Sequence, residues 1–145
     1  MNKLLSRTTL AALLLGSSFL ASAEDMPRTP APKGASVAIL APVDGATVDK
    51  TFTVKFGLKG MKLAPAGDQT PATGHHHLLI DVEQKPADNM PLPTTDNIKH
   101  FGKAQTETEL TLAPGKHTLQ LELGDKNHMP FDPPILSKKI TVTVK

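Results

Sequence analysis

Histidines are the residues of this sequence with the clearest capacity for chemistry. Six are present: three in a row at 75–77, and single ones at His100, His117 and His128. Imidazole changes its charge near neutral pH and is a common ligand of zinc and copper. The chain has no cysteine, which excludes disulfides, thiolate metal sites and thiol nucleophiles. A site in this protein therefore has to be built around imidazole.

The spacing of the histidine triplet favours metal binding. On a β-strand, His75 and His77 share one face while His76 faces the other way. Two imidazoles at i and i+2 can reach the same ion, and a nearby thioether would favour copper. The sequence thus predicts a copper or zinc site. Its candidate ligands are His75, His77, His100, His128 and Met129.

Four other residues are expected to support the fold or the site. His76 and His117 are interpreted as hydrogen-bonded structural histidines, since buried polar groups are normally satisfied locally. Asp81 and Asp125 could orient the imidazoles by accepting their N–H groups, or could form turns.

The sequence offers little for catalysis or for nucleic-acid binding. It has no Gly-x-Ser-x-Gly elbow, no glycine-rich phosphate loop and no His-Glu-x-x-His helix. We expect no enzyme, although three histidines and an open position would suffice for a metal hydrolase. Residues 24–145 hold 14 basic and 14 acidic residues, and phenylalanine is the only aromatic type apart from histidine. A neutral surface with few aromatics argues against nucleic acid as a partner.

The elements that must position these residues are strands. Apolar and polar residues alternate with period two in 51–58, 116–123 and 139–144, and three further segments between Pro/Gly turns complete a set of six strands. No convincing helical period occurs after residue 35. This pattern predicts an all-β fold, an antiparallel immunoglobulin-like (Greek-key) β-sandwich. The predicted strands are 36–41, 51–58, 75–82, 105–112, 116–123 and 139–144.

A Greek-key topology would gather the candidate ligands at one end of the sandwich. We expect strand 116–123 to pair antiparallel with 75–82 and, through a hairpin at 113–115, with 105–112. His117 would then lie at the opposite end. Its face of strand 116–123 is apolar, and Glu122 falls on the other, solvated face. The long connection 83–102 should pack across the site end through Ile98 and Phe101.

The first 35 residues suggest export. Residues 1–23 combine a basic start, an apolar stretch and a small-residue cleavage site at Ala21-Ser22-Ala23, the pattern of a signal peptide. Residues 24–35 are expected to form a Pro-rich tether with nothing to bury, followed by the sandwich domain at 36–145. The protein should then be periplasmic, with no membrane insertion once the signal is removed.

Four separated blocks resemble one bacterial exported family, domain of unknown function 4399. They agree in order and span most of residues 36–145. The resemblance implies an exported domain and supplies no mechanism. Phe131 departs from the family pattern, which often has a second histidine there. The blocks are GHHHLLID at 74–81, HFGKAQTE at 100–107, PGKHTLQL at 114–121 and 124–134, with Gly124-Asp125, His128-Met129-Pro130 and Asp132-Pro133-Pro134.

Two functions are compatible with these observations. The first is binding or delivery of a transition metal, copper or zinc, through the histidine cluster. The alternative is a non-catalytic envelope module that binds a protein or glycan partner, with the histidines forming a structural polar network. Convergence of four ligand atoms would favour the first.

Overall fold

A computed structural model describes residues 26–145, which contain nine strands and no helix. The predicted signal peptide at 1–23 lies outside the described residues. No helix in the described part is long and apolar enough to span a bilayer. The strands are β1 Ser36–Ala41, β2 Thr47–Val48, β3 Thr51–Lys59, β4 Lys62–Leu63, β5 Thr73–Ile80, β6 Ile98–His100, β7 Glu107–Thr111, β8 Gly115–Gly124 and β9 Ile140–Val144.

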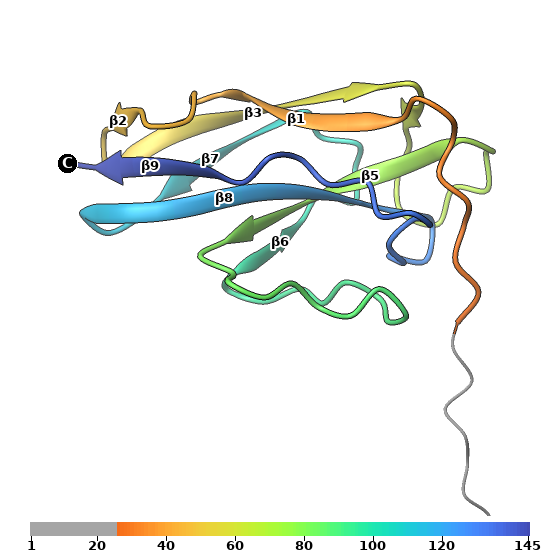
Figure 1. Cartoon of the computed structure of the whole chain (residues 1–145). Helices are drawn as coiled ribbons and strands as arrows, with labels where there is room; N and C mark the ends of the chain where they lie inside the picture. The colour runs from red at the N-terminus through yellow and green to blue at the C-terminus, as the bar shows by residue number, and fades with distance from the viewer. Residues whose placement is uncertain (1–25) are drawn as a thin grey trace, which may run out of the picture.

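The strands form two sheets that pack as a sandwich, which confirms the all-β prediction (Figure 1). The smaller sheet has the order β1-β3-β7. The larger sheet has the order β2-β9-β8-β5-β4, with β6 paired to β5. The long strands are antiparallel, and only the two-residue strands β2 and β4 pair in parallel. The specifically immunoglobulin-like topology stays a prediction.

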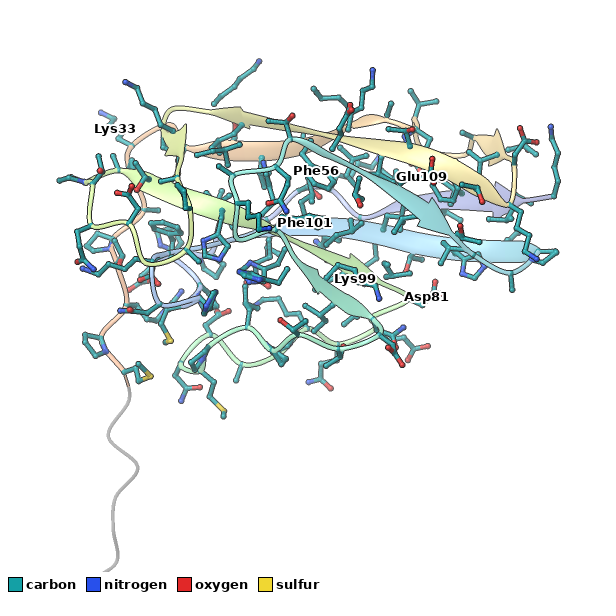
Figure 2. The ribbon with its side chains drawn as sticks, turned by 180° about the vertical axis from the view of Figure 1, so that it is seen from behind. Lys33, Phe56, Asp81, Lys99, Phe101 and Glu109 are labelled. Carbon is teal, nitrogen blue, oxygen red and sulfur yellow. The ribbon has the colours of Figure 1, made fainter. Side chains whose placement is uncertain are left out.

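The hydrophobic core lies between the two sheets. Phe56 of β3 and Phe101, just after β6, point toward one another there, with ring centroids 4.9 Å apart (Figure 2). The alternation seen in the sequence explains the remaining core, because every second residue of β5, β8 and β9 faces the small sheet. These residues are Leu78, Ile80, Leu119, Leu121, Leu123, Ile140 and Val142.

One predicted pairing is wrong. Strand β7 pairs with β3, with Phe52 opposite Leu110, and does not form a hairpin with β8. The physical reason is that β8 already has β5 on one edge and β9 on the other, so it offers no free edge. The Pro-Gly turn at 113–115 therefore carries the chain from one sheet to the other.

Two segments expected to be irregular are held by defined contacts. The connection 83–102 packs as predicted, with Leu92, Ile98 and Phe101 buried. Residues 83–97 run beneath the larger sheet, on the face turned away from the core, whereas β6 belongs to that sheet (Figure 1). The Pro-rich segment, by contrast, is not free of contacts: around Pro30 it bridges Asp132, with backbone hydrogen bonds of 2.8 and 2.9 Å.

His117 lies at the far end of β5 from the histidine triplet, as predicted. Its Nδ1 is 2.7 Å from Asp81 Oδ2 and its Nε2 is 2.8 Å from the Ala113 carbonyl. Both partners are acceptors, so only the protonated imidazole can donate to both of them. The hydrogen bond to Asp81 accordingly raises the pKa of His117, with the Ala113 carbonyl adding to the rise. Asp81 thus supports His117 and not the predicted metal site.

Replacing His117 tests this assignment. His117→Ala should lower the free energy of unfolding by about 1 kcal/mol at pH 5.5. Because the folded-state pKa of His117 is raised, its contribution is fully present below pH 6.5 and is lost as the pH rises through that pKa. Urea denaturation at pH 5.5 and pH 9 checks this. An equal loss at both pH values would contradict a protonated His117.

Candidate metal centre

Four histidines converge at one end of the larger sheet. His75, His77, His100 and His128 each offer a ring nitrogen, and these four atoms lie within 4.8 Å of one another. All six pairs of rings have centroids between 4.6 and 5.9 Å apart. Tetrahedral zinc with Zn–N bonds of about 2.05 Å places its nitrogens about 3.4 Å apart. A small inward movement of the rings would therefore give a four-histidine coordination sphere.

Strand pairing fixes the positions of three of the four histidines. His75 and His77 project from the same face of β5, the face turned away from the core. In the neighbouring strand β6, His100 is directly opposite His77. The next residue, Phe101, turns into the core and donates its amide to the His76 carbonyl at 3.0 Å. The core contact of Phe101 thus holds His100 in place.

A tight turn after β8 presents the fourth histidine. The Asp125 carboxylate accepts hydrogen bonds from the amides of Asn127 at 2.8 Å and Met129 at 3.0 Å. His128 donates its own amide to the Asp125 carbonyl and adopts a left-handed backbone, with φ of 65°. Its carbonyl accepts the amide of Leu92 from the 83–102 connection at 2.9 Å. Asp125 therefore shapes the turn that carries His128, as the turn alternative predicted.

Gly124 makes room for the cluster. It pairs with His75 across β5 and β8. A Cβ atom at this position would lie 2.7 Å from Cε1 of the His77 ring and 3.1 Å from its Nδ1. Gly124 therefore has to lack a side chain so that the His77 imidazole can occupy its place.

Four of the eight ring nitrogens in the cluster are buried without a hydrogen-bond partner among the described residues. His75 Nε2 lies 3.0 Å from His128 Nδ1. Among the residues described, Nδ1 of His75, both nitrogens of His77 and Nε2 of His100 are buried and unpaired. A buried polar group left unpaired costs about 1–3 kcal/mol. The cluster thus holds lone pairs that the protein itself does not use.

Burial keeps these imidazoles neutral. The pKa of His75 is lowered to about 4 and that of His77 to about 3, by burial first and then by the neighbouring histidines. Burial, followed by His128, also lowers the pKa of His100. Only neutral imidazole can donate a lone pair to a metal. Protons should therefore compete with a metal for His75, His77 and His100 only at a pH below 6.5, the ordinary pKa of histidine.

The remaining predicted residues lie outside the cluster. His76 faces the core, with its ring centroid 5.0 Å from that of Phe56. Neither of its nitrogens has a hydrogen-bond partner among the described residues, so the protein supplies none of the bonds expected for it. Met129 is fully buried directly after His128, and its part as a thioether ligand stays a prediction. Phe131 belongs to the core, and the four residues whose ring nitrogens converge do not include it.

Glu122 is the residue that the sequence analysis missed. The alternation of β8 correctly placed it opposite the apolar face, but its side chain is fully buried and not solvated. The covering segment 83–102 is the reason, because Lys85 of that segment lies 3.2 Å from Glu122 Oε1. The burial of Glu122 could have been predicted only from the position of this segment, and strand periodicity does not reveal that position.

The buried histidines predict acid sensitivity of the metal-free protein. His75, His76 and His77 have folded-state pKa values of about 4, 4 and 3. Unfolding lets each take up a proton below pH 6.5, so stability is highest above that pH and falls as the pH decreases. Each should contribute about 1.4 kcal/mol per pH unit. Urea denaturation in chelator from pH 7.5 to 5 measures the slope.

A matched variant separates one histidine from the others. His76→Phe keeps a ring beside Phe56 and removes one titrating group, so it should reduce the slope by about 1.4 kcal/mol per pH unit. A slope unchanged from that of the unmodified protein would contradict the assignment.

Comparison with known proteins identifies the chain at the level of family. No curated protein and no solved structure shows significant similarity to it. Residues 54–145, nearly two thirds of the chain, match the family described as Domain of unknown function (DUF4399). This segment includes all four clustered histidines together with the glycine and the turn that position them. The chain therefore belongs to the DUF4399 family.

Proposed function

We propose that this domain binds a transition metal ion, copper or zinc, through His75, His77, His100 and His128. The observation that carries the proposal is the convergence of four imidazoles, three of which have buried nitrogens without a hydrogen-bond partner among the described residues. Imidazole suits zinc and copper, and coordination would satisfy lone pairs that otherwise destabilise the fold.

Partial exposure of the site supports a role in carrying the metal. His75 and His77 are buried, whereas His100 and His128 are partly exposed. An ion could enter or leave past these two residues without opening the sandwich. In a protein that the first 23 residues would direct to the periplasm, we propose that the domain binds the metal and hands it to a partner.

Metal titration tests the proposal. Protein purified without a polyhistidine tag is titrated with Zn(II), Cu(II) and Cu(I), and at least one should bind with a Kd below about 1 µM, or −8 kcal/mol. The double variant His77→Phe, His128→Asn should abolish binding, because it removes two ligands while asparagine tolerates the positive φ of position 128.

His117→Ala is the control for this titration, since His117 lies at the opposite end of β5 and should leave the affinity unchanged. If no metal binds more tightly than 1 µM, the cluster is a polar network and the alternative of an envelope interaction module takes its place.

Space at Gly124 gives an independent test. Gly124→Ala should displace the His77 ring and weaken zinc binding at least tenfold, or 1.4 kcal/mol. Gly57→Ala, in the smaller sheet, is the matched control, because the atoms nearest to its Cβ would belong to the flexible, exposed side chain of Leu40. Calorimetry compares the two variants. Equal zinc affinity in both would show that the His77 ring does not hold the ion.

A further inference from the structure

A buried carboxylate lies in the same row as the histidine cluster. Across the larger sheet, Glu122 of β8 is directly opposite His77 of β5, and His77 is directly opposite His100 of β6. Side chains in such a row project from the same face, and directly opposite Cβ atoms are about 4.5–5.5 Å apart. A glutamate side chain is long enough to reach the imidazole beside it.

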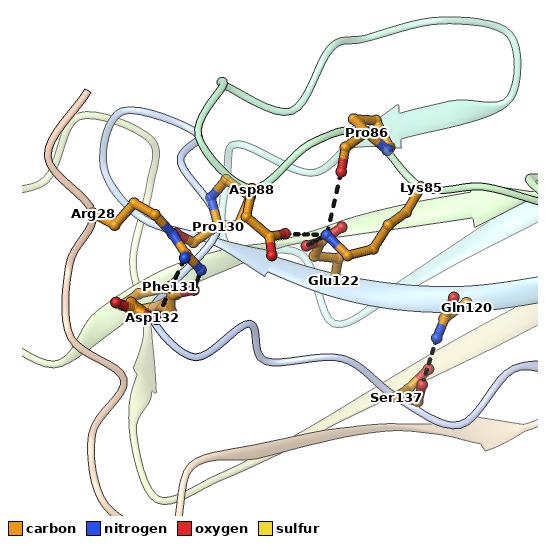
Figure 3. Close-up of polar contacts among 10 residues, drawn as sticks. All are labelled: Arg28, Lys85, Pro86, Asp88, Gln120, Glu122, Pro130, Phe131, Asp132 and Ser137. Carbon is orange, nitrogen blue, oxygen red and sulfur yellow. Dashed lines mark hydrogen bonds and ion pairs between the residues drawn. The ribbon is translucent and has the colours of Figure 1, made fainter. Parts of the chain in front are cut away.

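Glu122 is incompletely satisfied by its surroundings. Its side chain is fully buried. Oε1 lies 3.2 Å from Lys85 Nζ, while Oε2 has no partner among the described residues. Lys85 is itself shared with Asp88, as Figure 3 shows. One shared ammonium group leaves this buried carboxylate short of positive charge and of hydrogen-bond donors.

His77 lacks the partner that Glu122 could supply. Neither of its ring nitrogens is hydrogen-bonded. A histidine that gives one nitrogen to a metal keeps an N–H on the other, and that group usually donates to a carboxylate, a carbonyl or water. The unpaired Oε2 of Glu122 is a buried acceptor on the adjacent strand. The two unsatisfied groups are thus complementary once an ion is bound.

The negative charge of Glu122 also affects which metal ion the cluster would bind. A carboxylate stabilises a doubly charged ion about twice as strongly as a singly charged one at the same distance. The four clustered donors are imidazole nitrogens, whereas Cu(I) favours soft sulfur ligands. Both considerations favour Zn²⁺ or Cu²⁺.

We infer that Glu122 is the positioning carboxylate of this centre: it accepts the free N–H of His77 and balances the ion's charge, so that the centre takes a divalent ion in preference to Cu(I). This inference rests on the proposed function. Lys85 has the opposite effect, because its ammonium group competes with the ion for the same carboxylate.

Two variants with opposite expected effects test the inference. Glu122→Gln should weaken Zn²⁺ binding 10–100-fold, and Cu(I) binding by less, because the amide keeps the shape and loses the charge. Lys85→Met should leave Zn²⁺ binding equal or tighter. Glu109→Gln, at an exposed position of β7, is the charge-matched control and should change neither affinity. Zinc and Cu(I) affinities are measured by competition with chelators at pH 7.5.

Three results would overturn the inference. The first is a Zn²⁺ affinity of Glu122→Gln within twofold of the unmodified protein. The second is a loss in Lys85→Met equal to that in Glu122→Gln, which would mean that Glu122 only fastens the segment containing Lys85. The third result applies if Glu122→Gln fails to fold, and it is measured by imidazole ¹⁵N NMR of the zinc-loaded unmodified protein. In that experiment, a His77 N–H that exchanges rapidly with water would overturn the inference.

The failure of the proposed function is distinguishable from these results. If the unmodified protein does not bind zinc or copper, the metal centre itself is refuted and this inference with it. If it binds zinc and the variants behave as in the first or second result, the metal centre is supported and only the role of Glu122 is refuted.

Discussion

Strand β5 is buried on both faces from Gly74 to Ile80, although three consecutive residues within it are histidines. One face supplies Leu78 and Ile80 to the core between the sheets, and the other is covered by the 83–102 segment and by the turn after β8. Imidazoles in such a place must stay neutral, because burying an unpaired charge is far more costly than burying a dipole. Much of the surrounding structure can be understood as the means of keeping them there.

The covering elements are themselves fixed by contacts that do not involve a metal. Leu92 and Ile98 are buried, the Leu92 amide donates to the His128 carbonyl, and the Asp125 carboxylate closes the turn. The N-terminal segment adds Thr29, whose hydroxyl donates to the other oxygen of Asp125 at 2.6 Å. The site is thus preorganised, which reduces the entropy lost when a ligand binds.

Periodicity predicted most of the fold and part of the cluster, whereas His100 joins the cluster through β6, a strand that was not predicted. Alternation and turn signals predicted the six long strands, and the two-residue period of a strand placed His75 and His77 on one face. The antiparallel pairing of β5 with β8, expected for a Greek-key sandwich, brought His128 to them. Periodicity failed where the contacts are not periodic. The partner of β7 depends on which edges are already occupied, and the burial of Glu122 depends on a segment with almost no regular structure. Both are properties of the assembled sandwich and leave no local pattern.

The junction of His100 and Phe101 links the two faces of the larger sheet. Consecutive residues of an extended chain point to opposite sides, so one supplies a ring to the cluster and the next packs on Phe56 between the sheets. A shift of His100 would therefore have to be accompanied by repacking of the phenylalanines. The cluster consequently has the stiffness of the core on which it is mounted, and its ring positions are set by the same cooperative transition that folds the whole domain.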